Sequence, residues 1–146
     1  MYTFYNQQDD YNRQTNKLVS DIEKAINGEY SAIVCYAKIA EMAPTDKIRD
    51  QILEIRNDEI KHFHTFGQIY VNLTGMQPQP KIIEECPDTF VKGVEFALQD
   101  EQKTVDFYMD IMDETSDLAI KEAFRRAAAA EQHHAVWFLY YFSKVK

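Results

Sequence analysis

NDEIKHFHTF at residues 57–66 and AAEQHHAVWF at residues 129–138 each place a glutamate three residues before a histidine. A single glutamate precedes each pair by 30 residues, which completes a set of six residues in two matched halves. The set consists of Glu29, Glu59, His62, Glu101, Glu131 and His134. Because one offset of 72 residues relates each member of the first half to its counterpart, the sequence predicts two copies of one helical hairpin, each with half of a metal site.

The composition is typical of an all-α protein. The 146 residues include only 4 glycines and 4 prolines. Apolar residues recur with the roughly 3.6-residue period of a helix, and no segment shows the alternation of a strand. A chain of this length is expected to form one domain with its own hydrophobic core. We therefore expect a four-helix bundle built from two duplicated antiparallel hairpins.

The first predicted hairpin places three of the six residues on buried faces. In residues 16–42, apolar side chains recur every three or four positions, and Glu29 occupies the middle of that stripe. In residues 45–73, Glu59 and His62 occupy the corresponding stripe. Both glutamates lie about fifteen residues from the turn between the helices, so they come level in an antiparallel hairpin.

The second predicted hairpin repeats this plan. Residues 94–112 carry Glu101 in the middle of an apolar stripe. Residues 120–141 carry Glu131 and His134 in the same way. The repeat therefore predicts that both hairpins present their polar residues at one level of the bundle.

Local signals predict the ends of the second helix and a long connection after it. Pro44 ends the first helix, and Thr45 can cap the second by accepting hydrogen bonds from its free amides. Gly75 can end the second helix in a left-handed conformation. Residues 75–87 span up to roughly 45 Å when extended, which is enough to cross the length of a bundle. We expect a crossover between two parallel helices.

The two ends of the chain raise separate expectations. Residues 1–15 are polar with several aromatic side chains, and we expect an N-terminal arm or early helical turn laid on the body. Residues 16–146 are expected to form the bundle domain. The run at residues 135–142 is almost wholly apolar and needs a cover. The N-terminal aromatic residues or a second subunit would supply it, and the second case predicts a homodimer.

Charge and cysteine content exclude several classes of protein. The formal net charge of −8 argues against a nucleic-acid partner, because phosphate backbones are bound by Lys and Arg. No stretch has the roughly eighteen uncharged apolar residues of a membrane span. The sequence shows no signal peptide and no C-x-x-C motif, so we expect a cytoplasmic protein. Cys35 is expected to be a small buried residue and Cys86 a residue of the crossover.

Four glutamates on buried faces need compensating charge. Ionised carboxylates in apolar surroundings normally pair or lose their charge, and no Lys or Arg lies on these faces. Residues three apart on a helix point to neighbouring positions, so each glutamate–histidine pair can bind the same or adjacent ions. Two divalent cations would balance the four charges, and oxygen with imidazole donors suits iron or manganese. The alternative is a plain bundle with polar residues left in its core.

Other side chains near the six are less informative. Tyr36 and Tyr108 each lie seven residues, about two turns, beyond the single glutamate of their half. They are either donors or one-electron relays beside the metal ligands, or ordinary core aromatics. His64 and His133 have no glutamate three residues before them, so we expect them at the surface.

The order of the six residues resembles the di-iron ligand pattern of the ferritin-like superfamily, in particular its rubrerythrin and bacterioferritin branch. The resemblance extends from about Asn16 to Phe142. It implies that Glu59 and Glu131 bridge two metal ions. One glutamate and one histidine would complete each ion's coordination: Glu29, His62, Glu101 and His134.

The same resemblance implies an oxidoreductase with two iron ions, or manganese, that reduces peroxide or O₂ and is reduced again by an external electron donor. Ile60 stands where bacterioferritins have a haem-binding methionine, so no haem is expected. Thr104 stands where typical rubrerythrins have a further glutamate, and the C-x-x-C of a rubredoxin-like iron site is absent. The alternative is an iron-storage protein whose ferroxidase step feeds mineral formation in a larger assembly.

Overall fold

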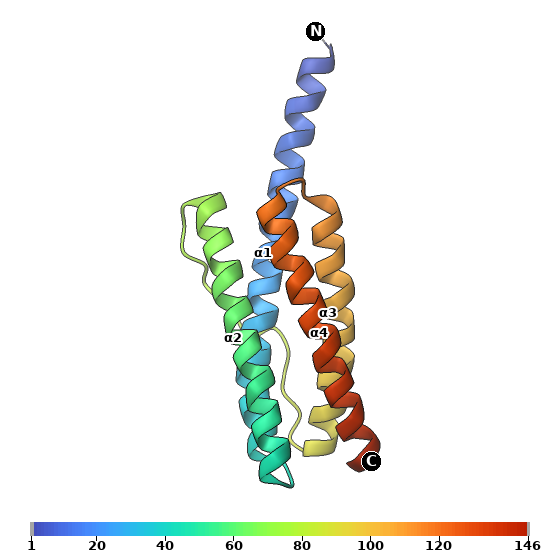
Figure 1. The fold of residues 1–146 in the computed structure, drawn as a ribbon. Coiled ribbons are helices and arrows are strands. Elements are labelled where there is room, and N and C mark those ends of the chain that lie inside the picture. The colour runs from blue at the N-terminus through green and yellow to red at the C-terminus, as the bar shows by residue number, and fades with distance from the viewer. Residues whose placement is uncertain (1, 146) are drawn as a thin grey trace.

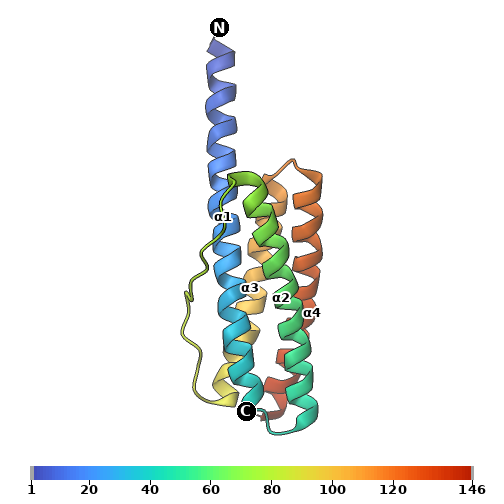
Figure 2. The ribbon, with the colours of Figure 1, turned by 90° about the vertical axis from the view of Figure 1, so that its left-hand side faces the viewer.

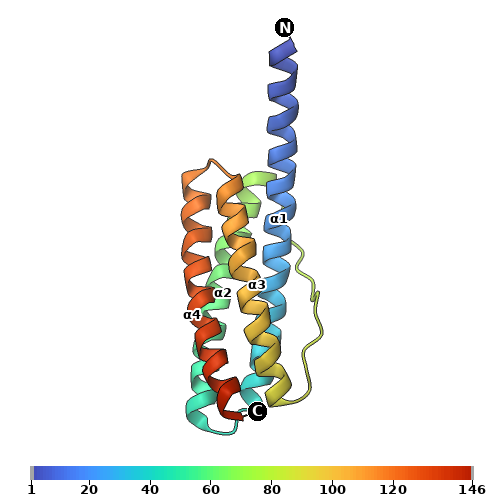
Figure 3. The same cartoon turned by 90° about the vertical axis from the view of Figure 1, so that its right-hand side faces the viewer.

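The computed structural model describes residues 2–145, with side chains from residue 7 onward. Over these residues the chain forms four helices and no strand: α1 (Tyr2–Glu41), α2 (Asp46–Thr74), α3 (Phe90–Glu114) and α4 (Leu118–Val145). α1 pairs with α2 and α3 with α4, while α1 also packs on α3 and α2 on α4. A long crossover returns along the outer side of α1 before α3 begins (Figures 1, 2 and 3). The predicted four-helix bundle of two hairpins is confirmed.

The predicted caps of α2 are also confirmed. The Thr45 hydroxyl accepts a hydrogen bond from the amide of Ile48 at 3.2 Å. Gly75 has a φ of 72°, in the left-handed region that favours glycine, and its N–H donates to the carbonyl of Val71. These caps fix the length of α2 and start the crossover at the far end of the bundle.

The N-terminal region differs from the predicted arm. α1 is continuous from Tyr2, and its first turns project beyond the bundle instead of lying on it (Figure 1). The first glycine is Gly28 and the first proline Pro44, so no residue breaks the helix earlier. Residues 7–14 are exposed because no other helix extends to their level. Tyr2, Phe4 and Tyr5 carry side chains outside the described part.

The apolar run of α4 therefore lacks one of its two predicted covers. The N-terminus lies at the opposite end of the molecule from the C-terminus in all three views, so the N-terminal aromatic residues do not reach this run of the same chain (Figures 1, 2 and 3). Val136, Leu139 and Tyr140 are about half exposed. This face of α4 is therefore exposed in the single chain.

The hydrophobic core consists of two clusters separated by the six polar residues. The cluster nearer the C-terminus includes Tyr36, Ile52 and Phe138. The other cluster includes Phe66 and Phe124, whose rings stack with centroids 4.4 Å apart. On each helix the predicted metal ligands fall between the residues of the two clusters. The apolar layers thus keep water from reaching the polar layer along the bundle axis.

The crossover is fastened to one stripe of α1 at four places. The contacts are Lys81 N to Asn27 Oδ1, Ile83 N to Ser31 Oγ, a Cys35–Cys86 disulfide, and an ion pair between Lys38 and Asp88. Cys35 is buried and Cys86 lies in the crossover, as predicted. Their pairing was not predicted, because 51 residues separate them and only the path of the crossover brings them together.

Candidate metal centre

All six predicted residues meet in the middle of the bundle. The four glutamates and His134 are at most 2% exposed, and the His62 side chain is 16% exposed. Each helix contributes at least one of them, because each carries its polar residue in the middle of an apolar stripe. The duplicated pattern therefore converges on one buried centre.

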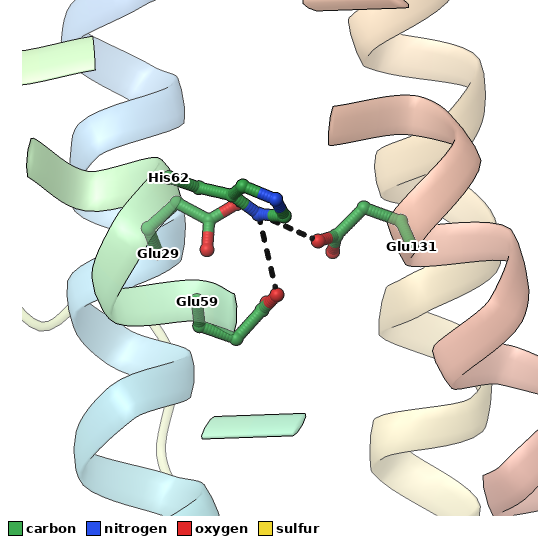
Figure 4. A group of neighbouring side chains, drawn as sticks. All are labelled: Glu29, Glu59, His62 and Glu131. Carbon is green, nitrogen blue, oxygen red and sulfur yellow. Dashed lines mark ion pairs between the residues drawn. The ribbon is translucent and has the colours of Figure 1, made fainter. Parts of the chain in front are cut away.

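The six residues form two overlapping groups of possible metal ligands. In each group one ligand atom per residue lies within 4.8 Å of the others. The first group is Glu29, Glu59, His62 and Glu131, shown in Figure 4, and the second is Glu59, Glu101, Glu131 and His134. Because Glu59 and Glu131 belong to both groups, the geometry suits two neighbouring ions that share two glutamates.

Unsatisfied polar atoms are gathered in the centre. Six buried side-chain atoms of the described residues have no hydrogen-bond partner, one from each of the six residues: Glu29 Oε2, Glu59 Oε1, His62 Nδ1, Glu101 Oε2, Glu131 Oε1 and His134 Nδ1. A buried polar atom without a partner is destabilising and demands an explanation. Four carboxylate oxygens and two imidazole nitrogens are suitable donors for iron or manganese. The residues present therefore fit a pair of such ions.

Two tyrosines orient Glu29 and Glu101, the two glutamates that each belong to only one of the two groups. The Tyr36 hydroxyl on α1 donates to Glu101 Oε1 on α3 at 2.6 Å. The Tyr108 hydroxyl on α3 donates to Glu29 Oε1 on α1. In each glutamate the other oxygen is the unsatisfied one. Both tyrosines are fully buried core aromatics and also hydrogen-bond donors, while their role as one-electron relays stays a prediction.

Asp58 is a partner of the centre that the sequence did not reveal. Its Oδ2 lies 2.8 Å from His134 Nε2, so an Nε2–H can donate to it while Nδ1 faces the glutamates. Such a carboxylate fixes the orientation of a metal-binding histidine. The residue equivalent to Asp58 in the second half is Ala130, so the repeat gave no signal for it and His62 has no matching partner there.

The centre is reached from solvent between α2 and α4. A surface groove of about 360 Å³ between α2 and α4 reaches His62. Its rim includes Asp58, Lys61 and Arg126. His134, by contrast, is 1% exposed. The two halves thus have matching ligands but unequal access.

Burial and mutual charge shift the pKa values of the centre. Burial, followed by the charge of Glu59, raises the pKa of Glu29 well above its usual value. Burial also raises the pKa of Glu131, and the charge of Glu101 adds to it. Burial alone would lower the pKa of His62, but nearby carboxylates outweigh it and raise the pKa to about 10. Without metal, protons supply the positive charge that the glutamates require.

The same balance acts on the second histidine and on one bridging candidate. The glutamates outweigh burial and raise the pKa of His134 to about 11. Burial would raise the pKa of Glu59, but the two nearby histidines outweigh it and hold that pKa below its usual value. The two imidazoles are therefore the main carriers of protons in the metal-free centre.

Three further residues that the sequence analysis considered lie outside the set of possible ligands. His64 and His133 are exposed, as predicted. The Thr104 hydroxyl donates to the backbone carbonyl of Asp100 at 2.8 Å and offers no carboxylate to the centre. No helix within residues 2–145 is long and apolar enough to cross a membrane.

Comparisons with known proteins agree with this geometry. The family model for rubrerythrin matches residues 21–142. The Bacillus subtilis protein YhjR, which is uncharacterised, is 54% identical over 129 residues, covering 88% of this chain and 89% of YhjR. Similar solved structures include the bacterioferritin of Desulfovibrio desulfuricans, with a diiron site, at a TM-score of 0.79 and 19% identity, covering 91% of this chain and 82% of that one. A ferritin-like, diiron-carboxylate protein from Bacillus anthracis has a TM-score of 0.77 at 18% identity, with coverages of 88% and 97%.

Proposed function

The chain belongs to the rubrerythrin family, and from this premise we propose that it is a non-haem di-iron oxidoreductase that reduces peroxide or O₂. The observation that supports the proposal best is the set of six unsatisfied atoms, one from each predicted ligand. Glu59 and Glu131 would bridge the two ions, as their shared membership of both groups favours. One ion would also bind Glu29 and His62, and the other ion would bind Glu101 and His134. Manganese is the alternative metal.

The protein's own contribution is to hold and shield the reacting centre. Two ions held there would supply one electron each, which is the chemistry that a two-electron reduction of peroxide requires. The apolar clusters on both sides keep water from the centre. Burial raises the pKa values of Tyr36 and Tyr108 well above the usual range, so both keep their protons. They therefore act as fixed donors that hold Glu101 and Glu29 in place.

The charge at the opening favours the enzyme over iron storage. Lys61 and Arg126 stand on the rim of the groove that reaches His62, and Asp58 is engaged with His134. A positive rim repels incoming Fe(II), which a storage protein must admit repeatedly, whereas neutral peroxide or O₂ is unaffected. The storage alternative also needs a large shell, while the apolar face at the C-terminal end of α4 offers a contact for one second copy.

That apolar surface supports a homodimer. A surface groove of about 620 Å³ at the C-terminal end of α4 is lined mainly by apolar and aromatic side chains, among them Ile48, Val136, Trp137 and Tyr140. Apolar surfaces of this kind usually mark contacts between proteins. We include in the proposal a cytoplasmic homodimer that pairs through this face and receives electrons from an external donor.

Metal analysis followed by anaerobic mixing tests the proposal. Purified protein reconstituted with Fe(II) should bind two ions per chain, and peroxide or O₂ should oxidise them. Glu59→Ala and Glu131→Ala should each remove most of the bound iron, whereas exposed Glu95→Ala should not. Less than one metal per chain, unchanged by either substitution, would leave only a structural bundle. Gel filtration distinguishes the oxidoreductase from the iron-storage alternative. A dimer would exclude iron storage, and a large hollow assembly would exclude the simple enzyme.

A further inference from the structure

We propose that Cys35 and Cys86 form a redox-active pair that returns two electrons to the metal centre after each oxidation. This inference rests on the proposed function and adds an internal reductant to it. The sequence alone indicated no internal electron donor, because the two cysteines are not in a C-x-x-C motif. The crossover joins their sulfur atoms across 51 residues.

The pair lies one residue from the centre's hydrogen-bond network. Cys35 is followed directly by Tyr36, whose hydroxyl donates to Glu101 Oε1 at 2.6 Å. Cys35 and Tyr36 belong to the same buried cluster, which packs against the polar layer. An electron leaving the sulfur of Cys35 therefore crosses one peptide unit, one tyrosine and one hydrogen bond to reach a metal ligand. No solvent interrupts this route, because both residues are at most 4% exposed.

The two sulfur atoms differ in access, as a reducible pair requires. Cys35 is 4% exposed, whereas Cys86 lies in the crossover and is only partly buried. An external thiolate can attack the Cys86 sulfur and form a mixed disulfide there, which releases Cys35 as the thiolate next to the centre. A second thiol then frees Cys86. Reducing equivalents enter from solvent at Cys86, and Cys35 is the cysteine that adjoins Tyr36.

The crossover does not need the disulfide in order to stay in place. Ile83 is held by Ser31 on one side of it, at 2.9 Å, and Asp88 is held by Lys38 on the other side, at 2.7 Å. These contacts keep the two thiols close when the bond is open, so the bond can form again without refolding. Neither contact depends on the S–S bond, so the crossover stays attached on both sides of Cys86 when the bond is open.

The internal repeat supplies a matched control. At the offset of 72, Tyr36 corresponds to Tyr108, but Cys35 corresponds to Phe107. Both tyrosines bind the equivalent glutamate of the other hairpin, and only Tyr36 adjoins a cysteine. Any effect common to both tyrosines belongs to ligand orientation. An effect confined to Tyr36 belongs to the cysteine pair.

The electrons balance for one peroxide. Peroxide takes up two electrons and two protons and becomes two waters, which leaves two ferric ions. The two cysteine thiols then lose two protons and two electrons as their S–S bond forms, and one electron returns each ion to the ferrous state. Two external thiols reopen the disulfide and leave as an external disulfide. The net reaction is peroxide plus two thiols giving two waters and one disulfide.

Counting thiols tests the proposal with a readout other than turnover. Protein reduced by dithiothreitol is freed of reductant under nitrogen, loaded with two Fe(II) per chain and mixed with one equivalent of hydrogen peroxide. Thiols are counted by maleimide labelling and mass spectrometry, and Fe(II) is counted with a chelating dye. We expect the thiols to fall from two to none per chain while Fe(II) is recovered. Without iron, thiol loss should be at least tenfold slower.

Variants separate the possible failures. In Cys35→Ser and Cys86→Ser, iron should be oxidised once and stay ferric. Thiol loss should be at least fivefold slower in Tyr36→Phe than in Tyr108→Phe, and circular dichroism verifies that each variant is folded. Thiols that persist beside ferric iron, or that disappear equally fast without iron, overturn the cysteine role while the proposed function stands. Protein that binds or oxidises no iron overturns both.

Discussion

Replacing Glu131 with glutamine should have opposite consequences with and without metal. The substitution keeps the shape of the side chain and removes its charge. In the metal-free protein, the ligand oxygen of Glu131 lies within 4.8 Å of those of three other glutamates. At an effective dielectric constant of about 20, each such pair repels by at least about 3.5 kcal/mol when both are ionised, which gives at least about 10 kcal/mol in total.

The histidines offset that repulsion and leave the cost of burial. Glu131 Oε1 lies 3.1 Å from His62 Nδ1 and 3.8 Å from His134 Nδ1. Two protonated imidazoles at these distances attract the Glu131 carboxylate by about 10 kcal/mol in total at the same dielectric constant. The lost hydration of the carboxylate remains uncompensated, so Glu131 holds a proton, in agreement with its raised pKa. Glutamine then replaces a neutral carboxyl, and the unfolding free energy should change by no more than about 1 kcal/mol.

With metal the substitution removes a shared ligand. If the amide lowers the affinity for each of the two ions about tenfold, the metal-bound state loses about 3 kcal/mol of stability. For a domain of this size that lowers the metal-dependent rise in Tm by about 6–12 °C. Calorimetry with chelator and with Mn(II) measures both effects, with exposed Glu95→Gln as the control. A loss of several kcal/mol in chelator, or an undiminished rise with Mn(II), would refute the reasoning.

Three further outcomes follow from the structure. The pKa values of His62 and His134 are raised to about 10 and 11. Their stabilising contribution is therefore complete below about pH 6.5 and is lost as the pH rises through those values. The Tm in chelator should fall from pH 7 to 11, while the rise in Tm on metal binding grows. Asp58→Ala should lower the affinity for the metal ion at His134 roughly 10–100-fold, as measured by chelator competition. Gly93→Ala puts a Cβ 2.9 Å from Ile39 and should cost about 1–3 kcal/mol in urea unfolding, whereas Gly28→Ala, with open space, should gain up to about 1 kcal/mol.

The fold and the six-residue cluster were predictable because both depend on periodicity. Residues that recur every three or four positions define a helix face whatever surrounds it. Glu29 and Glu101 were recognisable because each interrupts an apolar stripe, and the common offset showed that the interruptions belong together. Their meeting in one buried centre follows from antiparallel packing of equal hairpins.

The features that were not predicted depend on contacts without periodicity. Asp58 directly precedes Glu59, on a face that only the packing of α4 turns toward His134. The sulfur atoms of Cys35 and Cys86 meet because residues of the crossover follow α1, and no spacing rule encodes that path. The length of α1 was underestimated for a different reason, since a polar segment without glycine or proline can remain helical with no partner.

In the proposed function, these unpredicted contacts would make a symmetric ligand set work asymmetrically. The groove that reaches His62 lies between α2 and α4, and the crossover with Cys86 lies along α1, on the other side of the bundle (Figures 2 and 3). Peroxide would therefore approach one ion from one face, while electrons would arrive through Tyr36 and Glu101 at the other ion from the opposite face. Separate routes would let the reductant reduce the two ions again without obstructing the approach of the oxidant. An iron-storage site has no need of such a division, because its Fe(II) is both the substrate and the source of electrons.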